Sequence, residues 1–317
     1  MTSTDQPPTL AIVVPCFNEE AALPTTAPAL LKTLSLCQQK KKISQLSAIY
    51  FVDDGSVDNT WQTIEELASQ NENVSGIKLA RNVGHQNALL AGIFSVKEDV
   101  VVTIDADLQD DPFAIEKMLD RHAEGSEIVY GVRRFRNKDT KFKRGSAWAF
   151  YKLISLMGAR IVENHADFRL MSRFAIECLR EYGEANMFLR GIIPLIGLET
   201  ARVLYDRDER AFGETKYPLR KMLGFAWEGV TSFTVTPLRA ISLLGSLLAM
   251  LSLLGLFWVL WIRLFTDLAV PGWASVLLPL LGLSAVQLLS LGVVGEYIGK
   301  IYKETKRRPR YVVERSV

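Results

Sequence analysis

Short apolar runs alternate with amphipathic segments through the first half of the chain. The runs are rich in β-branched residues and span residues 10–14, 48–52, 74–79, 100–104 and 128–132. Between them, apolar residues recur at helical spacing in segments 59–68, 86–96 and 112–122. Strands that alternate with helices predict an α/β, Rossmann-like fold with a mainly parallel sheet covered on both faces.

The pattern changes after about residue 234. Residues 240–262 contain no charged side chain, and neither do residues 268–295. About 20 apolar residues are enough for a helix to cross the hydrocarbon core of a bilayer. We therefore predict a transmembrane hairpin of two helices within residues 234–296. A buried hairpin in a soluble core is the alternative, and two adjacent stretches of this length make it the poorer interpretation.

The charges around this hairpin predict its orientation. Residues 297–317 contain seven basic and two acidic side chains, whereas the loop between the spans contains only two charged side chains, Arg263 and Asp267. The positive-inside rule then places both chain ends in the cytosol and the loop outside. Residues 217–233 have an apolar side, which an ordinary surface helix packed on the core would also show. Their position just before the first span favours an interfacial amphipathic helix.

The other segments follow from composition. Residues 1–8 are polar and are expected to form a flexible N-terminus rather than a signal peptide. Three scattered cysteines indicate reduced thiols in a cytosolic body. The predicted organisation is a catalytic or binding domain at 9–216, the interfacial helix, the hairpin at 234–296 and a basic cytosolic tail at 297–317.

Polar side chains gather where the predicted strands end. They are Asn18 and Glu19, Asp53 and Asp54, Arg81 and Asn82, and Asp105 and Asp107. In parallel α/β sheets, ligands bind beyond the carboxyl ends of the strands. The sequence thus predicts a polar ligand site at this edge of the sheet.

Asp105 and Asp107 leave a strand apolar enough to be fully buried. Two such carboxylates repel each other unless a cation lies between them. Mg²⁺ or Mn²⁺, held by one or two carboxylates, keeps positions open for substrate phosphates, and Gln109 could add a neutral oxygen. For the triplet at residues 105–107, the ordinary alternative is a solvated turn. For residues 53–56, the alternative is a tight turn that caps the following helix, in which Gly55 supplies backbone freedom.

Four ordered motifs carry a specific resemblance. They are residues 13–20 (VVPCFNEE), 52–58 (VDDGSVD), 81–85 (RNVGH) and 105–110 (DADLQD). They resemble the motifs of inverting GT-A glycosyltransferases of family 2. Within that family the chain is similar, over almost its whole length, to polyprenyl-phosphate glycosyltransferases, which include dolichyl-phosphate mannose synthases and bacterial prenyl-phosphate glucosyltransferases.

The resemblance implies a nucleotide-sugar site and a metal site. The expected donor-site residues are Pro15, Asn18, Glu19, Asp54 and Arg81, with Arg210 and Lys216 closing over the diphosphate. Asp105, Asp107 and Gln109 would hold the metal. Independently of the resemblance, negative charge grows on a leaving diphosphate as the glycosidic bond breaks, and a divalent cation stabilises that charge.

A basic stretch at residues 133–144 is the candidate site for the acceptor. A solvated face is the usual interpretation of a charge run, and nucleic acid is disfavoured because the protein is nearly neutral and lacks an RNA-binding motif. The resemblance implies instead that the stretch binds a lipid phosphate. The acceptor-site residues so implied are Arg133 and Arg144, with Lys143 and Ser146 as weaker candidates.

A phosphate acceptor changes the requirement for a general base. A sugar hydroxyl must lose its proton during attack, whereas a phosphate monoester is already largely ionised near neutral pH. Asp167 occupies the position where family 2 enzymes keep their candidate base, and the resemblance makes it a catalytic residue. It either accepts a proton, orients the acceptor or holds Arg169.

Together these features predict a hexosyltransferase of the bacterial inner membrane that serves cell-envelope glycan synthesis. It would transfer glucose from UDP-glucose to polyprenyl phosphate with inversion, on the cytosolic leaflet, and a second copy of the chain is among its expected partners. A GDP-mannose-dependent enzyme is the nearest alternative. A processive polysaccharide synthase lacks support because its Gln-x-x-Arg-Trp signature is absent, and intact acidic strand ends argue against a non-catalytic membrane scaffold.

Overall fold

The computed structural model describes residues 6–134, 165–184, 189–206 and 273–317, together with scattered residues between 238 and 265. The chain divides into two compact units. The first comprises Met1–Lys152, Arg160–Pro218 and Arg308–Val317, and the second comprises Leu153–Ala159 and Leu219–Arg307. The described residues of the first unit build the sheet.

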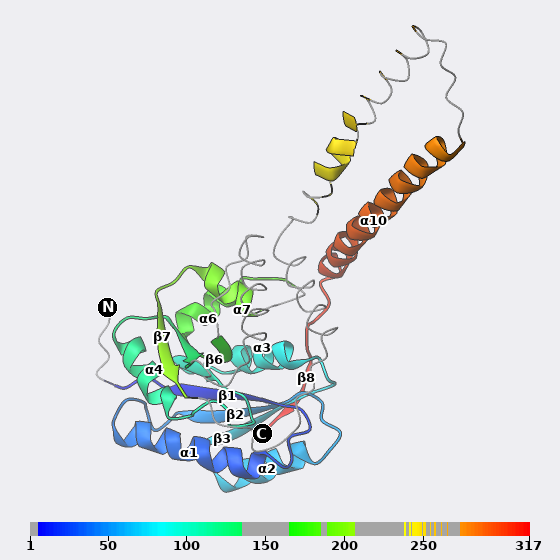
Figure 1. Ribbon diagram of the computed structural model, residues 1–317. Helices are drawn as coiled ribbons and strands as arrows, with labels where there is room; N and C mark the ends of the chain where they lie inside the picture. Colours follow the sequence, from blue (N-terminus) through cyan, green and yellow to red (C-terminus); the bar gives the residue numbers. More distant parts are fainter. Residues whose placement is uncertain are drawn as a thin grey trace. The chain divides into compact units, whose positions relative to one another are not determined.

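The sheet has eight strands among the described residues (Figure 1). They are β1 (Leu10–Cys16), β2 (Ala48–Asp53), β3 (Val74–Leu79), β4 (Val100–Thr103), β5 (Ile128–Arg133), β6 (His165–Ser172), β7 (Thr200–Tyr205) and β8 (Val313–Ser316). Their order across the sheet is β7-β5-β6-β4-β1-β2-β3-β8.

All five strands predicted from the sequence are present, and most of the pairing is parallel. β1 pairs in parallel with β2 and β4, β2 with β3, and β5 with β7. β6 runs antiparallel between β4 and β5, and β8 runs antiparallel along β3. The predicted α/β class with a mainly parallel sheet is confirmed, with two antiparallel strands that were not anticipated.

Helices cover both faces of this sheet (Figure 1). On one face lie α1 (Leu23–Gln39), α2 (Thr60–Gln70) and α4 (Ala114–Ala123), and on the other lie α3 (His85–Ser95) and α6 (Arg173–Arg180). Every residue of β1 is buried, as expected for a central strand with a helical layer on each side. The short helix α7 (Leu189–Ile192) and a 3-10 turn (Ile193–Ile196) follow α6.

The chain changes direction at β1, and the two strands beside this point separate. From β1 it proceeds to β2 and β3 on one side, and then returns to β4 on the other. The last β1–β4 pair is Val13 with Thr103. The Val13 carbonyl accepts from the Ile104 N–H, after β4, and the Cys16 carbonyl accepts from the Asp54 N–H, after β2. Backbone groups alternate in direction along a strand, so the Pro15 nitrogen points to the β4 side, as the Val13 carbonyl does, but beyond the last β1–β4 pair. The N–H that proline lacks therefore costs no hydrogen bond between the strands. Such switch points are where α/β sheets bind ligands.

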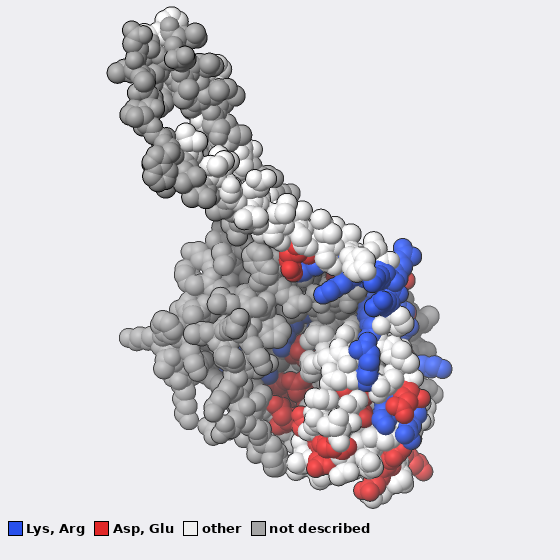
Figure 2. Space-filling view, turned by 90° about the vertical axis from the view of Figure 1, so that its right-hand side faces the viewer, with Lys and Arg blue, Asp and Glu red and all other residues white. Residues whose placement is uncertain are grey.

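The second unit contains the long helix α10 (Trp273–Thr305). Within the described residues, one helix, Gly282–Thr305, is long and apolar enough to cross a membrane. Figure 2 shows a largely white, uncharged surface along α10. The helix continues past residue 296, where the second span was expected to end. The first predicted span, residues 240–262, lies mostly outside the described residues, so a two-helix hairpin stays a prediction.

The predicted basic tail at 297–317 contains two elements of secondary structure. Its first part completes α10, and Val313–Ser316 forms β8. Val317 and Gly76 exchange backbone hydrogen bonds of 3.0 and 2.9 Å. A Cβ on Gly76 would lie 3.0 Å from Val317 Cγ2 and 2.5 Å from Ile64 Cγ2, so glycine permits this close approach. The tail therefore covers the edge of β3.

Candidate functional site

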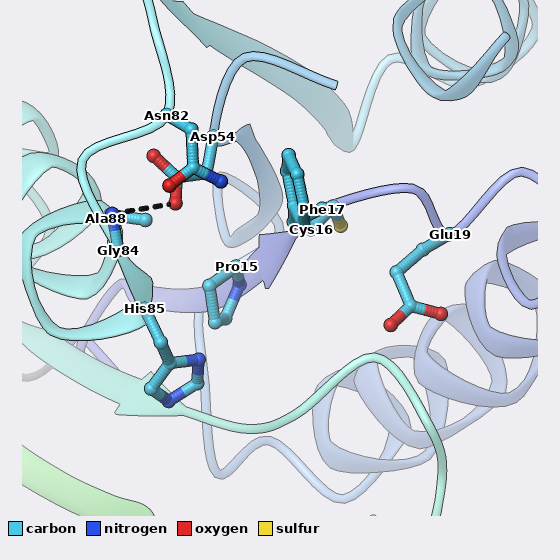
Figure 3. A pocket seen from close by; sticks show the side chains of 9 residues that line it. All are labelled: Pro15, Cys16, Phe17, Glu19, Asp54, Asn82, Gly84, His85 and Ala88. Atoms are coloured by element: carbon cyan, nitrogen blue, oxygen red, sulfur yellow. Dashed lines mark hydrogen bonds between the residues drawn. The ribbon is translucent and has the colours of Figure 1, made fainter. Parts of the chain in front are cut away.

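A pocket of about 320 Å³ opens at the carboxyl ends of β1 and β2 (Figure 3). It is lined by Pro15, Cys16, Phe17, Glu19, Asp54, Asn82, Gly84, His85 and Ala88. Pro15 and Cys16 end β1, Phe17 and Glu19 follow it, Asp54 follows β2, and the rest come from the turn before α3 and from α3 itself. Pro15, Glu19 and Asp54 of the predicted donor site thus share one pocket. Asn18 and Arg81 are not among its lining residues.

Asp53 and Asp54 shape the loops around this pocket. The Asp53 carboxylate accepts a hydrogen bond of 3.0 Å from the Ser56 N–H and so closes the turn after β2. The Asp54 carboxylate accepts from the N–H groups of Val83 and Gly84, at 2.8 and 2.9 Å. Asp54 therefore fixes the loop between β3 and α3 as well as lining the pocket.

Gly55 allows these two loops to meet. Its φ is +67°, and a Cβ there would lie 2.6 Å from both Arg81 C and Asn82 N. An L side chain is strained at this φ, and no backbone atom can approach a Cβ so closely. The glycine in the sequence motif is thus required by contact with the Arg81–Asn82 backbone, and the exposed Arg81 lies at this contact.

Asn18 has a positioning role in the loop after β1. Its φ is +57°, a left-handed conformation that asparagine tolerates better than most residues. Its side-chain oxygen accepts from the Val57 N–H at 3.0 Å, and its own N–H donates to Ser56 Oγ at 3.0 Å. Asn18 therefore ties the loop after β1 to the loop after β2.

Asp105 and Asp107 follow β4 in a turn with Leu108 at φ +50°. Asp105 Oδ1 is buried and accepts no hydrogen bond from a described residue, and His85 Nε2 lies 3.6 Å away. Burial, with the nearby carboxylates of Asp167, Asp110 and Asp107, raises the pKa of Asp105 to about 6 against the opposing effect of His85. This carboxylate lies where a further positive charge would be stabilising.

The predicted metal ligands fit a divalent cation in part. Asp105 and Asp107 supply hard oxygen ligands. Gln109 is buried beside them, and its backbone N–H donates to Asp107 Oδ1 at 3.2 Å. The described residues contain no group of three or more His, Cys, Asp or Glu side chains placed to hold a metal ion. Mg²⁺ and Mn²⁺ sites that open onto phosphates need only one or two carboxylates, so this does not conflict with the prediction.

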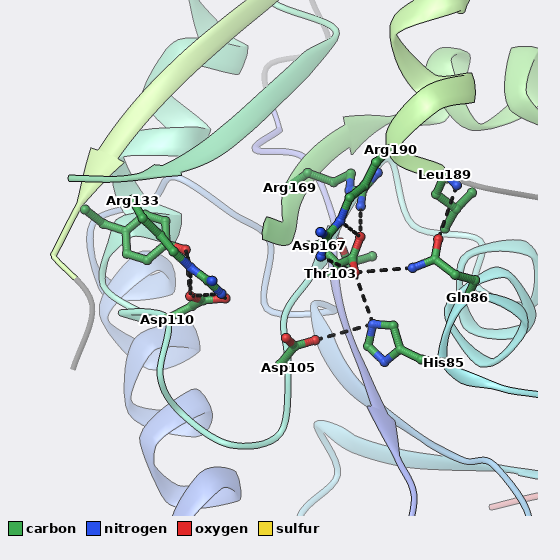
Figure 4. Close-up of polar contacts among 11 residues, drawn as sticks. His85, Gln86, Thr103, Asp105, Asp110, Arg133, Asp167, Arg169, Leu189 and Arg190 are labelled. Atoms are coloured by element: carbon green, nitrogen blue, oxygen red, sulfur yellow. Dashed lines mark hydrogen bonds and ion pairs between the residues drawn. The ribbon is translucent and has the colours of Figure 1, made fainter. Parts of the chain in front are cut away.

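Asp167 lies at the centre of a buried ion-pair network (Figure 4). It is bonded by Arg169, which is itself fully buried, and by Arg190 of α7 through Nε and Nη2 at 3.2 and 3.0 Å. His85 Nε2 lies 3.3 Å from Asp167 Oδ2, and Gln86 donates to the same oxygen at 3.3 Å.

These partners control the protonation of Asp167. Burial alone would raise its pKa, but His85, Arg169 and Arg190 outweigh burial and hold the pKa of Asp167 well below its usual range. A carboxylate held ionised in this way is a weak proton acceptor. Of the alternatives considered from the sequence, the contacts favour a residue that holds arginines.

Arg133, at the end of β5, is the predicted acceptor residue that the structure describes. Its Nε and Nη2 donate to the two oxygens of Asp110 at 3.1 and 3.3 Å. The Tyr205 hydroxyl of β7 donates to Asp110 at 2.6 Å and accepts from Arg133 at 3.2 Å. Arg144, Lys143, Ser146, Arg210 and Lys216 lie outside the described residues, so their predicted roles are unchanged.

Sequence analysis left several residues of this network unassigned. They are His85, Gln86, Asp110, Arg190 and Tyr205. His85 and Asp110 stand within the motifs at 81–85 and 105–110, so their motifs offered a signal. Arg190 had none, because only the fold brings α7 beside Asp167.

A mainly parallel sheet with a pocket at its switch point, and with a carboxylate cluster (Asp105, Asp107, Asp110 and Asp167) beside that pocket, is the arrangement of a GT-A glycosyltransferase. The chain matches Glycosyl transferase family 2 over residues 11–180. The protein belongs to this family and is a glycosyltransferase.

Curated relatives align with nearly the whole chain. The uncharacterized glycosyltransferase YkoT of Bacillus subtilis is 49% identical over 97% of this chain and 91% of its own length. A bactoprenol glucosyl transferase of Shigella phage SfV is 38% identical over 96% of this chain and 98% of its own.

Solved structures are more distant. Glucosyl-3-phosphoglycerate synthase from Mycobacterium tuberculosis, crystallised with Mn²⁺, UDP and glucosyl-3-phosphoglycerate, is 17% identical over 71% of this chain and 78% of that one, with a TM-score of 0.46. A likeness at this level is too slight to bear on substrate or metal.

Proposed function

We propose that this protein transfers glucose from UDP-glucose to a polyprenyl phosphate at the cytosolic leaflet, with inversion at the anomeric carbon. The observation that carries the proposal is the full-length similarity, at 37–38% identity, to proteins described as bactoprenol glucosyl transferases. The described site adds a pocket for a nucleotide beside a carboxylate cluster and a fixed arginine.

The donor would bind with its nucleoside in the pocket of Pro15, Glu19 and Asp54. Asp105 and Asp107, with Gln109, would hold Mg²⁺ or Mn²⁺ against the diphosphate. When bound, the metal would neutralise the charge that develops on the leaving diphosphate. Arg81, Arg210 and Lys216 remain further candidates for the diphosphate and Asn18 for shaping the pocket.

The acceptor would attack as an ionised phosphate monoester, so the chain's own contribution is to position it. A phosphate with a second pKa of about 6 needs no strong base at neutral pH. The ion-paired state of Asp167 agrees with this, since a carboxylate held by Arg169 and Arg190 is unsuited to collecting a proton. Arg133 would bind the phosphate, together with Arg144, Lys143 and Ser146. A single displacement by that phosphate inverts the anomeric centre.

The transfer reaction itself tests the proposal. Purified full-length protein in detergent would be given Mn²⁺, polyprenyl phosphate and, in parallel, radiolabelled UDP-glucose and GDP-mannose. We expect labelled glycolipid from UDP-glucose, with a β-linkage when the donor is α-linked. Transfer from GDP-mannose alone would reassign the sugar, and an insoluble polymer or no transfer to lipid from any nucleotide sugar would refute the proposed reaction.

A further inference from the structure

Two arginines near the carboxylate cluster are each held by a buried aspartate. Arg133 is held by Asp110, and Arg190 is held by Asp167. Asp110 and Asp167 are 1% and 4% exposed, so neither carboxylate can pair with ions from the solvent. Each buried carboxylate instead fixes one guanidinium group.

The two ion pairs, Arg133–Asp110 and Arg190–Asp167, use the same edge of the guanidinium group. In both, Nε and Nη2 donate to the carboxylate, at 3.1 and 3.3 Å for Arg133 and at 3.2 and 3.0 Å for Arg190. In neither case does Nη1 donate to any described residue. The side chains of Arg133 and Arg190 are 29% and 41% exposed, whereas that of Arg169 is 1% exposed. Arg133 and Arg190 thus have donors left for a ligand.

Their positions relate them to Asp105. In Figure 4, Asp105 lies between the Arg133–Asp110 pair and the side chain of His85, with Asp167 and Arg190 above. Burial opposes the charged form of Arg190, but Asp167 and Asp105 outweigh burial and raise the pKa of Arg190, against the opposing charge of Arg133. The charge of Arg133 thus opposes that of Arg190, and an anion bound by both guanidinium groups would offset this repulsion.

The two arginines lie outside the lining of the nucleotide pocket. His85 lines the pocket and contacts both Asp105 and Asp167, whereas neither Arg133 nor Arg190 lines it. For Arg190, the contacts run from the pocket through His85 to Asp167 and then to the guanidinium group. Arg190 is therefore joined to the pocket through these two residues without lining it.

We propose that Arg190, held by Asp167, is a phosphate-binding residue of the acceptor site and forms a pair with Arg133 across Asp105. Each guanidinium offers a fixed N–H edge, which suits the oxygens of a phosphate monoester better than a mobile lysine does. Asp167 is then a positioning residue, because it acts through Arg190. The inference rests on the proposed function, since it assigns the acceptor of that reaction.

Replacing Arg190 by glutamine tests this role. The comparison is between wild type, Arg190→Gln and Arg180→Gln in the full-length protein. Arg180 is a matched control because it is 45% exposed, pairs with Glu177 and lies over the ring of Phe94, away from the carboxylate cluster. KM is measured separately for polyprenyl phosphate and for UDP-glucose, and UDP binding is followed by thermal stabilisation.

We expect Arg190→Gln to raise the KM for polyprenyl phosphate about 10- to 100-fold, the range for a lost charged hydrogen bond. The KM for UDP-glucose and the stabilisation by UDP should stay within about two-fold of wild type, and Arg180→Gln should match wild type throughout. An unchanged KM for the lipid overturns the proposal. A change confined to UDP-glucose would assign Arg190 to the donor diphosphate and overturn it equally.

A conservative variant protects the test against misfolding. Arg190→Lys keeps the charge but loses the two-pronged donor, so its KM for the lipid should lie between those of wild type and Arg190→Gln. If Arg190→Gln does not fold, Arg190→Lys is compared with wild type in the same way. A wild-type KM in that variant would overturn the requirement for a fixed guanidinium edge.

Asp167→Asn separates a positioning role from a base. Loss of positioning should raise the KM for the lipid and leave the shape of the pH profile unchanged. Loss of a general base should instead lower kcat by about 10²- to 10⁴-fold with the KM retained, and that result would overturn the positioning role.

Failure of the proposed reaction can be told apart from failure of this inference. If wild type makes no glycolipid, the proposed reaction fails. Binding of a short-chain polyprenyl phosphate, measured by thermal stabilisation of wild type and Arg190→Gln, then still decides the role of Arg190. Equal stabilisation of the two proteins would overturn it, and a loss confined to the variant would support it.

Discussion

The carboxylates at the edge of the sheet have different surroundings, and these give them different roles. Asp54 accepts two backbone N–H groups, and Asp167 is paired with Arg169 and Arg190. Asp105 differs from both, because its Oδ1 accepts no hydrogen bond from a described residue, its ion-pair contact among the described residues is His85 at 3.6 Å, and the carboxylates of Asp167, Asp110 and Asp107 lie nearby. We therefore expect the response to a divalent cation to depend on Asp105.

Asp105→Asn should stabilise the metal-free protein at pH 7.5. Burial raises the pKa of Asp105 to about 6, above the unfolded value of about 3.9. As the pH falls, Asp105 is therefore protonated in the folded protein before it is protonated in the unfolded chain. The stability that this protonation contributes is fully present below about pH 4, is lost as the pH rises to about 6, and is absent above that pH. Since the side chain is 34% exposed, solvent screening limits the gain in the variant to about 1 kcal/mol.

Mn²⁺ should reverse this difference in stability between wild type and Asp105→Asn. Thermal unfolding in EDTA and in Mn²⁺ would be compared for the two proteins. We expect Mn²⁺ to raise the melting temperature of wild type but not of Asp105→Asn, whose transferase activity should be abolished. Equal stabilisation of both proteins by Mn²⁺ would contradict the metal site.

Gly55→Ala should disturb both the fold and the pocket. A Cβ at Gly55 would meet the Arg81–Asn82 backbone at 2.6 Å, and φ is +67°. We expect a loss of about 2–4 kcal/mol in the free energy of unfolding, from strain and overpacking together, with weaker UDP binding. Gly125→Ala is the matched control, because φ is +107° but nothing lies within 4 Å of its Cβ. It should lose only about 1–2 kcal/mol and keep UDP binding.

At the scale of elements, the strands with clear patterns were predictable and the others were not. The five apolar runs of the first half are all strands. Strand β6 was interpreted only as a motif around Asp167, and β8 was interpreted as a basic tail. β8 is an edge strand with every residue exposed, so it lacks the alternation of apolar and polar residues that identifies a half-buried strand.

The same distinction applies to the site. Asp105, Asp107 and Asp54 could be located because each follows a strand that the sequence predicts. Arg190 could not, because α7 is a helix of four residues and its approach to Asp167 depends on the tertiary fold. Local sequence patterns report the ends of strands, whereas pairing between distant elements follows from packing.

Removal of β8 should destabilise the sheet. Deleting residues 313–317 leaves the N–H and C=O groups of β3 unpaired along one edge, and exposed edges promote association. We expect a lower melting temperature and a concentration-dependent loss of monodispersity in detergent. Arg315→Gln removes the ion pair with Glu65 but keeps the strand, so it should stay close to wild type. A deletion variant as stable as wild type would show that β8 is dispensable.

At the scale of the whole molecule, the two units differ in what covers their surfaces. The first has charged side chains over a buried apolar core, whereas α10 exposes Leu283, Leu288 and Leu291 along its length. Exposed apolar side chains in such a row are typical of a lipid-facing helix. The number of spans and their orientation stay predictions from the sequence.

Cysteine labelling in membrane vesicles would test that orientation. In a protein whose three native cysteines are replaced by serine, Asp267→Cys and Val317→Cys would be compared with a membrane-impermeant reagent. In right-side-out vesicles we expect labelling at position 267 and none at position 317, with the opposite result in inverted vesicles. Labelling of both positions from the same side would rule out a two-span hairpin.

The position of β8 in the chain also constrains biosynthesis. Residues 313–316 leave the ribosome only after α10 has been made, yet they pair with β3, whose residues are synthesised more than 230 positions earlier. Until then the hydrogen-bonding edge of β3 is open to any passing strand, including one from another nascent copy. Synthesis of α10 thus precedes closure of the sheet by β8. Soluble versions of that domain will need these residues restored through an artificial connection.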